Sequence, residues 1–127
     1  MVTATRLNQR LICASDELVE GGRGQRFIVN RYGVSESAFA VRFRGEVRAY
    51  LNRCGHVPVE LDWQPNEFFD HSGLYLICAT HGALYAPESG HCVGGRCNGK
   101  GLVVLSVVEH DERVFLIEEG KDSVGQQ

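Results

Sequence analysis

Apolar and polar residues alternate over short stretches along most of the chain, and turn-forming residues separate these stretches. Alternation with a period of two on both sides of a short turn predicts a β-hairpin. Two pairs of stretches have this form: 38–44 and 47–51 around Gly45–Glu46, and 102–108 and 113–118 around His110–Glu112.

Helical periodicity is almost absent. Residues 10–14 and 26–30 are short apolar runs typical of strands, and residues 16–20 suffice for one helical turn. No stretch sustains the repeat of three to four residues that marks an amphipathic helix. Many short strands separated by turns predict an antiparallel all-β domain.

The middle of the chain has a different character. From Asn52 to Gly101 the alternation gives way to segments rich in Gly, His, Cys and Pro, and these hold most of the chain's five cysteines and five histidines. Cys and His are residue types that bind metals and carry redox chemistry. We therefore expect the chemistry of the protein in this segment, between the two hairpins.

Length and charge exclude several classes of function. A chain of 127 residues makes one domain, and a net charge of −3 argues against nucleic acid as the partner. No run approaches the ~20 apolar residues of a spanning helix, and residues 1–12 do not resemble a secretory signal. We expect a soluble, cytoplasmic protein without a membrane anchor. In that compartment, cysteines bind metals or act in redox chemistry more often than they form disulfides.

Two short motifs dominate the central segment: Cys54-Gly55-His56 and Cys78-Ala79-Thr80-His81. Each offers one thiolate and one imidazole on a tight loop. Two such loops at the ends of neighbouring strands would bring two sulfur and two nitrogen ligands together. The residue types alone leave two metals open, because a structural zinc site uses the same four ligands as an iron–sulfur site.

The two motifs and their flanks resemble the Rieske [2Fe–2S] family, whose signature is C-x-H, a spacer, and C-x-x-H. Residues 47–56 resemble the family's entry into its first cluster loop, and residues 81–85 resemble its second. Pro87–Gly90 and Cys92–Cys97 resemble the turn and third loop of small Rieske-type ferredoxins, although Arg96 stands where related loops often have proline. The resemblance covers roughly residues 26 to 118.

The resemblance implies a fold and a cofactor. The fold is an antiparallel Rieske-like domain, with a basal β-sandwich or barrel over about 10–52 and 100–119 and a cluster-binding subdomain over about 53–99. The cofactor is one [2Fe–2S] cluster per chain. Cys54 and Cys78 would bind one iron, and His56 and His81 would bind the other.

The resemblance also implies a range for the reduction potential. Two thiolates and two neutral imidazoles leave the oxidised cluster formally neutral, so it accepts an electron more readily than a four-thiolate cluster, at about −150 to +300 mV across the class. High-potential members have a serine donor at the position of Ala83, and a tyrosine near a ligand sulfur at the position of Tyr85. The disulfide that braces their loops would fall at Val59 and Thr80, which cannot form it. We expect a potential in the lower half of the range.

The implied function is that of an electron carrier and not of an enzyme. Such a ferredoxin accepts one electron from a reductase and passes it to a terminal oxidoreductase, docking near His56 and His81. The alternatives are a structural zinc module, a cluster-based sensor, and a small subunit of a reductase such as nitrite reductase. A ring-hydroxylase catalytic subunit needs a further iron site with two His and one carboxylate, for which we expect no room in 127 residues.

The remaining cysteines and aromatic residues have structural interpretations. We expect Cys92 and Cys97 to be structural thiols, although their spacing also permits a small disulfide, and Cys13 to be a buried strand residue. We expect the aromatic residues of the spacer, Trp63, Phe68 and Phe69, to pack beneath the cluster loops.

Three histidines lie outside the two motifs. We expect all three to be solvated turn residues: His71, His91 and His110. The run from Trp63 to His71 makes the spacer between the motifs slightly long, and it is our candidate for an insertion specific to this protein.

Overall fold

The computed structural model describes residues 7–54, 59–62, 64–78, 82–95 and 100–119. It confirms an antiparallel all-β fold with one short 3-10 helix at Ser15–Glu17 among these residues. The strands, in chain order, are β1 (Leu7–Ala14), β2 (Gln25–Arg31), β3 (Val34–Phe43), β4 (Glu46–Leu51), β5 (Leu76–Ile77), β6 (Leu84–Tyr85), β7 (Cys92–Gly94), β8 (Val104–Leu105), β9 (Val107–His110) and β10 (Arg113–Glu119).

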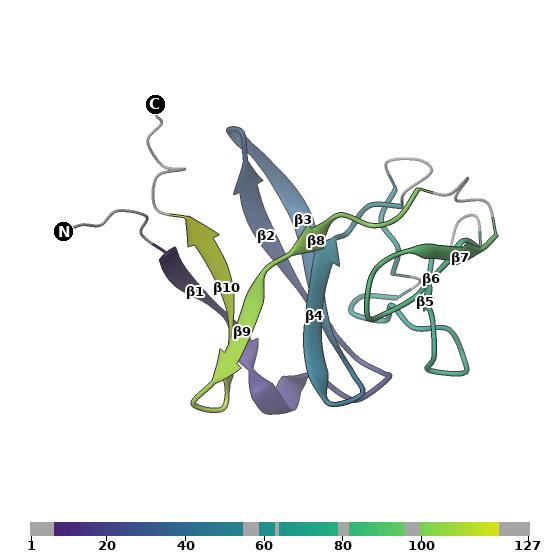
Figure 1. Cartoon of the computed structure of the whole chain (residues 1–127), viewed down its shortest axis with the longest axis horizontal. Helices are drawn as coiled ribbons and strands as arrows, with labels where there is room; N and C mark the ends of the chain where they lie inside the picture. The colour runs from purple at the N-terminus through teal and green to yellow at the C-terminus, as the bar shows by residue number, and fades with distance from the viewer. Residues whose placement is uncertain (1–6, 55–58, 63, 79–81, 96–99, 120–127) are drawn as a thin grey trace.

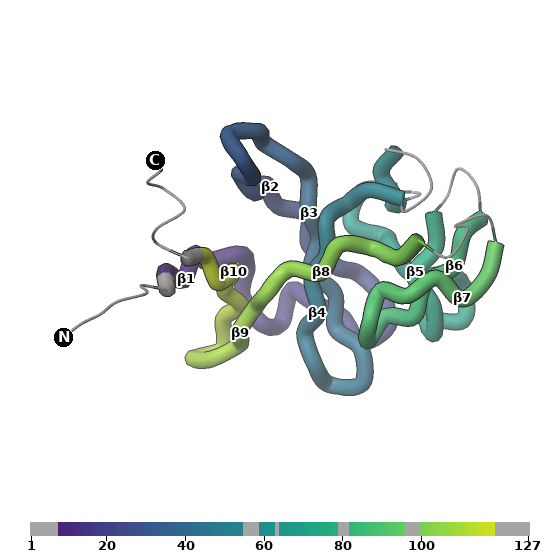
Figure 2. Tube along the Cα trace, turned by 45° about the horizontal axis from the view of Figure 1, so that its top comes forward, coloured from purple at the N-terminus to yellow at the C-terminus, as the bar shows by residue number. Residues whose placement is uncertain are grey.

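Three sheets stand side by side (Figure 1). The sheet β2-β3-β4-β8 lies between the sheet β1-β10-β9 and the small sheet β5-β6-β7. Figure 2 shows the same order from another angle, with β8 carrying the chain from the small sheet back across β4. The small sheet was not foreseen as strands, because its members have only two or three residues.

From Ala38 to Val41, strand β3 is buried on both faces, and it links two cores. Ala38 and Ala40 face the sheet β1-β10-β9, where small side chains let the two sheets pack closely. Phe39 and Val41 point the other way, into the core beneath β5-β6-β7. Because successive side chains of a strand alternate between its faces, the run Ala-Phe-Ala-Val gives one small-residue face and one bulky face.

Hairpin turns set the register of the longer strands. The turns Tyr32–Gly33, Arg44–Gly45 and Asp111–Glu112 have positive φ at both central residues, as two-residue turns of the I′ kind require. The hairpin of residues 38–51 is confirmed, but its turn is Arg44–Gly45, one residue earlier than predicted, because Phe43 pairs with Glu46. The hairpin of β2 and β3 around Tyr32–Gly33 was not predicted.

The second predicted hairpin is confirmed only in its outer part. Residues 107–110 pair with 113–116, but Val104 and Leu105 pair with β4 in the central sheet. The chain therefore changes sheets at Ser106, whose carbonyl accepts the backbone N–H of Ile117. Alternation shows which residues face a core, but it does not show which strand each residue pairs with. The prediction of a single strand over residues 102–108 is therefore wrong.

The expected helical turn at residues 16–20 is shorter and lies earlier. The 3-10 helix covers only Ser15–Glu17. Glu20 instead accepts the backbone N–H groups of Arg44 and Gly45 through its carboxylate. These contacts lower the pKa of Glu20 and tie the N-terminal segment to the β3–β4 turn.

Candidate metal centre

The first cysteine of the proposed ligand set follows the end of β4. Cys54 is buried, and its backbone N–H donates to the carbonyl of Val59 at 2.8 Å. This hydrogen bond brings residues 54 and 59 together. His56 lies outside the described residues.

The second cysteine follows β5. Cys78 is fully buried, and it closes the β5–β6 connection with two backbone hydrogen bonds: its N–H donates to Ala83, and its carbonyl accepts from Gly82. Leu76 pairs with Tyr85 and Ile77 with Leu84, so Cys78 lies at the start of the loop that joins the strands. His81 lies outside the described residues.

The two cysteines belong to one core although more than twenty residues of sequence separate them. Both keep their thiols, and both pack in the apolar cluster that includes Leu61, Phe68 and Tyr85. The two loops therefore start from a common buried base. Two thiols held in this way can serve as ligands to a single metal centre.

Tyr85 provides a polar contact within this apolar base. Its side chain is fully buried, and its hydroxyl oxygen lies 3.3 Å from Sγ of Cys54. When Cys54 is a thiolate, the hydroxyl is the group that can donate the hydrogen bond. Ala83, directly before β6, is also fully buried and has no side-chain donor.

Aromatic side chains form the floor of the site. Phe68 stacks on Phe39 with ring centroids 4.0 Å apart, and the ring centroids of Phe69 and Phe43 are 6.1 Å apart. This confirms the prediction that Phe68 and Phe69 pack beneath the cluster loops. Trp63, which was assigned the same position, lies outside the described residues.

Tyr50 connects the central sheet to the segment beyond β6. Its hydroxyl donates to the backbone carbonyl of Pro87 at 2.6 Å, and burial raises the pKa of this tyrosine to about 12. This hydrogen bond thus attaches the turn that includes Pro87 to strand β4. Sequence reasoning missed this role, because a tyrosine in an alternating strand gives no indication of a polar partner 37 residues away.

The segment containing β7 packs closely on the second cysteine loop. A Cβ atom at Gly95 would lie 2.6 Å from the carbonyl oxygen of Gly82 and 2.7 Å from Cα of Ala83, so only glycine fits there. Cys92 on β7 is disulfide-bonded, which contradicts our expectation of a thiol at this position. The expectation rested on the reducing compartment and not on geometry. Cys97 lies outside the described residues.

The cysteine and histidines outside the motifs take different positions. Cys13 is buried in β1, as predicted, and its pKa is raised to about 11 by burial. His71 and His91 are exposed. His110 is exposed but is the last residue of β9 rather than a turn residue: its ring stacks on Phe115, and its Nε2 is 2.7 Å from Oε1 of Gln9.

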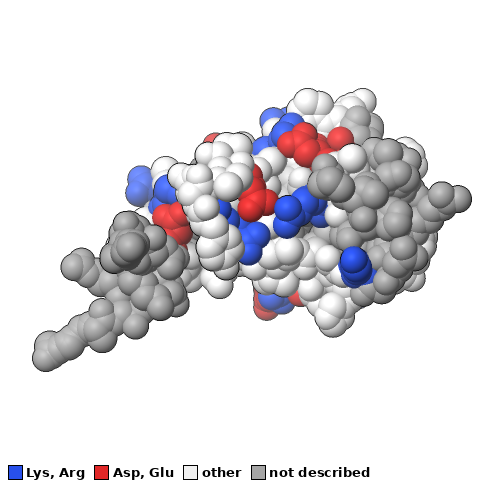
Figure 3. Space-filling model, turned by 90° about the horizontal axis from the view of Figure 1, so that it is seen from above, with Lys and Arg blue, Asp and Glu red and all other residues white. Residues whose placement is uncertain are grey.

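Charges of opposite sign pair on the described surface. On the face seen in Figure 3, Lys and Arg lie beside Asp and Glu. Arg31 and Arg53 both pair with Glu36, and Arg42 pairs with Glu109 at 2.7 Å.

Within the ranges that the structure describes, no helix is long and apolar enough to cross a membrane. Within the same ranges, no three His, Cys, Asp or Glu side chains gather as a metal site, since both motif histidines lie outside them.

A family comparison decides the identity of this site. The model of the Rieske [2Fe–2S] domain matches residues 8–115. The chain belongs to the Rieske [2Fe–2S] domain family. The cofactor of this Rieske domain is one [2Fe–2S] cluster, as the sequence resemblance implied, and the domain is an electron-transfer module. The zinc interpretation is not favoured. No curated protein sequence matches the chain significantly.

Solved structures share the fold of this Rieske domain. The ferredoxin of carbazole 1,9a-dioxygenase from Nocardioides aromaticivorans IC177 superposes with a TM-score of 0.65 at 19% identity, covering 86% of this chain and 96% of that one. The ferredoxin of Sphingomonas yanoikuyae B1 gives 0.66 at 18%, covering 87% and 99%. The terminal oxygenase of the Nocardioides enzyme gives 0.63 at 23%, covering 86% of this chain but 29% of the oxygenase.

The described side chains fit the cofactor. Two buried thiols, a phenol hydroxyl beside one of them and an apolar surround are a suitable donor set and environment for the thiolate-bound side of an iron–sulfur cluster.

Proposed function

We propose that Cys54 and Cys78 bind one iron of the cluster and that His56 and His81 bind the other. The placement of the two thiols in one core supports the first half of this assignment. The second half rests on the spacing of the motifs, since each histidine follows its cysteine by two or three residues.

The bound cluster supplies one-electron redox chemistry, and the surrounding residues tune its potential. The Tyr85 hydroxyl is placed to donate to Cys54, which favours the more negative reduced state. Ala83 offers no such donor at its buried position. One donor where high-potential members have two supports a potential in the lower half of the Rieske range.

We further propose that the chain is a ferredoxin-type carrier and does not itself catalyse a reaction. It would accept an electron from a reductase and deliver it to a terminal oxidoreductase, with the docking face near His56 and His81. The observation that carries this proposal is the family match over residues 8–115, supported by the extent of the overlap with the two ferredoxins. In this proposal the carrier works in the cytoplasm.

Spectroscopy of the purified protein provides the first test. We expect a red-brown protein with two irons per chain, and an EPR signal on reduction whose average g lies below that of four-cysteine clusters. A colourless protein containing zinc would overturn the proposal. Carrier function is tested by stopped-flow mixing of the reduced protein with a candidate terminal oxygenase and, separately, of the oxidised protein with a reductase and its reductant. If the reductase does not reduce the cluster and the oxygenase does not oxidise it, the result would favour a function as a cluster-based sensor.

The histidine ligands have a test of their own. Replacing His56 with Cys exchanges a neutral ligand for an anionic one, so we expect the cluster to be kept and its potential to fall towards the roughly −400 mV of four-cysteine ferredoxins. His71→Cys, at an exposed site outside the motifs, is the matched control and should leave the potential unchanged. A wild-type potential in His56→Cys would remove His56 from the ligand set.

The pH dependence of the potential tests the same assignment. An iron-bound imidazole keeps a second ring nitrogen that can lose its proton, and oxidation of the cluster favours that loss because it adds positive charge. We therefore expect the potential to fall as the pH rises beyond a threshold. A potential that stays flat into strongly alkaline solution contradicts exposed histidine ligation.

A further inference from the structure

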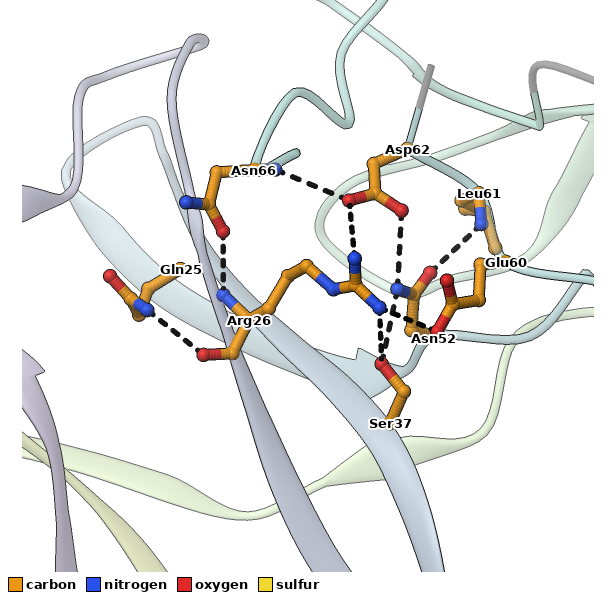
Figure 4. A network of polar contacts seen from close by, with 8 residues as sticks. All are labelled: Gln25, Arg26, Ser37, Asn52, Glu60, Leu61, Asp62 and Asn66. Carbon is orange, nitrogen blue, oxygen red and sulfur yellow. Dashed lines mark hydrogen bonds and ion pairs between the residues drawn. The ribbon is translucent and has the colours of Figure 1, made fainter. Parts of the chain in front are cut away.

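Asn52 is a buried polar side chain that lies directly before the first cysteine loop. It follows the last residue of β4, stands two positions ahead of Cys54, and is only 3% exposed. Its Oδ1 accepts the backbone N–H of Leu61 at 2.8 Å. Its Nδ2 donates to Oγ of Ser37 at 3.2 Å and to Oδ1 of Asp62 at 3.3 Å (Figure 4).

A second layer of polar contacts holds Asp62 in place. Its side chain is 3% exposed, and its Oδ2 accepts the backbone N–H of Asn66 at 3.2 Å and lies 3.6 Å from the Arg26 guanidinium. Arg26 also donates to Glu60 at 2.6 Å and, through its backbone N–H, to Oδ1 of Asn66 at 2.9 Å. Figure 4 shows these side chains converging on Arg26 from the segment that follows the first cysteine loop.

These contacts fasten both ends of the first cysteine loop to the central sheet. The loop starts after Asn52 and returns at Leu61, and the Asn52 amide joins these two points directly. Inside that span, Cys54 makes its own hydrogen bond to Val59. The position of the Cys54 sulfur, and its distance from the Tyr85 hydroxyl, therefore depend on a closure made by a side chain and not by a strand ladder.

The closure requires an amide. One oxygen must accept from a backbone N–H while the neighbouring atom donates to a carboxylate, and only Asn has both groups on a side chain of this length. Aspartate would turn its second oxygen towards Asp62, and two carboxylates at this distance repel. Leucine would leave the Leu61 N–H and the Asp62 oxygen without these bonds in a buried place.

We propose that Asn52 is a positioning residue for the iron–sulfur cluster, with Asp62 as its counterpart. The pair holds the first ligand loop in the geometry that retains the cluster and sets its electronic environment. This inference rests on the proposed assignment of Cys54 as a ligand. Asn52 and Asp62 are not themselves proposed as iron ligands, so the inference makes predictions that the ligand assignment alone does not make.

A double-mutant cycle with isosteric variants tests the proposal. In Asn52→Asp two carboxylates face each other, and in Asp62→Asn two amide donors compete for the same space. In the exchange Asn52→Asp/Asp62→Asn, the amide introduced at position 62 donates to the carboxylate introduced at position 52, which still accepts from Leu61. The oxygen of that amide can still accept from Asn66 and face Arg26. The exchange restores the hydrogen bonds that positions 52 and 62 make with each other, with Leu61 and with Asn66, and it conserves the net charge. It replaces the Arg26–Asp62 ion pair with a contact to a neutral amide, while Arg26 keeps its ion pair with Glu60.

We expect each single variant to lose its cluster about tenfold faster than the wild-type protein, in line with the usual cost of removing a partner that orients a metal ligand. The exchange should return the half-life of the cluster to within about threefold of wild type. Cluster loss is followed by the visible absorption. The EPR g-values of the reduced cluster should shift in the single variants and return in the exchange, which a general loss of stability would not cause.

Val29→Ala provides the stability control, because Val29 is buried in β2 on the far side of the central sheet from the cysteines. It should lower the unfolding midpoint and leave the g-values unchanged. The proposal is wrong if the single variants keep wild-type g-values and cluster half-lives no shorter than that of Val29→Ala. It is also wrong if the cluster half-life of the exchange variant is shortened by the sum of the two single effects. Should a single variant fail to fold, the exchange decides alone: it must fold and keep the cluster. A wild-type protein without a cluster would instead overturn the proposed function.

Discussion

The two larger sheets, β1-β10-β9 and β2-β3-β4-β8, are called the basal sheets here, and the described residues between Asn52 and Gly95 are called the cysteine-bearing region. The two are stabilised in different ways. In the basal part, β3 has ten residues and pairs along most of its length with β2 on one side and β4 on the other. In the cysteine-bearing region, β5 and β6 have two residues each, and most of the described backbone runs through turns. Backbone ladders hold the first region, whereas buried side chains such as Phe68, Tyr85 and Asn52 hold the second.

This difference indicates how the protein separates stability from redox chemistry. The ladder of a long hairpin forms without a cofactor, because its hydrogen bonds and apolar faces are complete within the chain. Short strands have few ladder hydrogen bonds, so their arrangement depends on packing, on polar closures and on the cluster itself. Changes in one region should therefore have effects that the other does not share.

The largest expected effect is the loss of the cluster from Cys54→Ala. Without one thiolate ligand, we expect no stable cluster, measured as loss of iron and of visible absorption. The basal sheets should still fold, as judged by far-ultraviolet circular dichroism. Cys13→Ala is the matched control, since Cys13 is equally a buried thiol but lies in β1, and it should keep the cluster. Retention of the wild-type spectrum by Cys54→Ala would exclude this cysteine as a ligand.

The next effect is on the aromatic floor. Phe68→Ala removes a fully buried ring stacked on Phe39, and we expect the free energy of unfolding to fall by about 3–5 kcal/mol in a denaturant titration. We also expect faster cluster loss, because the same core holds both cysteines. Val29→Ala should cost roughly 2 kcal/mol without altering cluster lifetime. Equal cluster lifetimes in the two variants would remove the distinction between the regions.

A smaller effect is expected on the reduction potential. Tyr85→Phe removes the hydroxyl beside the Cys54 sulfur and keeps the ring, so we expect a lower potential by an amount on the order of tens of millivolts. The direction follows because the hydroxyl stabilises the more negative reduced state. Tyr32→Phe, at a residue that is 95% exposed, should leave the potential unchanged. A rise in potential would mean that Tyr85 accepts rather than donates.

The smallest effect at neutral pH concerns Tyr50, which connects the two regions, and its pH dependence appears in alkaline solution. The pKa of Tyr50 is raised from 10.0 to about 12, so the folded protein holds a proton there that the unfolded chain loses. The resulting stability is present below pH 10 and is lost as the pH rises through 12, at up to about 1.4 kcal/mol per pH unit. Tyr50→Phe should lack this slope and should lose about 1 kcal/mol at neutral pH with the Pro87 hydrogen bond.

A second alkaline transition must be separated from that of Tyr50. Burial raises the pKa of Cys13 from 9.0 to about 11, so this thiol also contributes stability that is lost as the pH rises through that range. Measurements of Tyr50→Phe in a Cys13→Ala background isolate the tyrosine. An unchanged slope in that pair of variants would show that another group causes the alkaline loss.

The sequence predicted the features that depend on local pattern and on residue type. The alternation around Gly45 located the central hairpin, and the spacing of Cys54 and Cys78 with their histidines indicated the family. The structure adds the convergence of both thiols in one core, while the histidines lie outside the described residues. The partner proteins and the assignment of the four iron ligands stay proposals.

Features that depend on long-range partners were not accessible from the sequence. Nothing in the run from Leu102 to Val108 shows that Ser106 divides it between two sheets. Nothing near Asn52 shows that its amide meets Leu61 and Asp62, because side-chain hydrogen bonds carry no periodic pattern. Strands of two residues, such as β5, are too short for alternation to be detected. The disulfide at Cys92 was missed because compartment and not geometry guided the expectation.

The Asp111–Glu112 turn offers a practical point of attachment. It joins β9 and β10 at the end of the molecule opposite the small sheet β5-β6-β7 (Figure 1), and both of its residues are exposed. A single cysteine for a fluorophore, or a short tether to an electrode, placed at Asp111 would keep the cysteine-bearing end directed towards solution. Glu112 has a φ of 61°, which glycine adopts without strain. Glu112→Gly, next to the attachment site at Asp111, would therefore relieve the backbone of the turn.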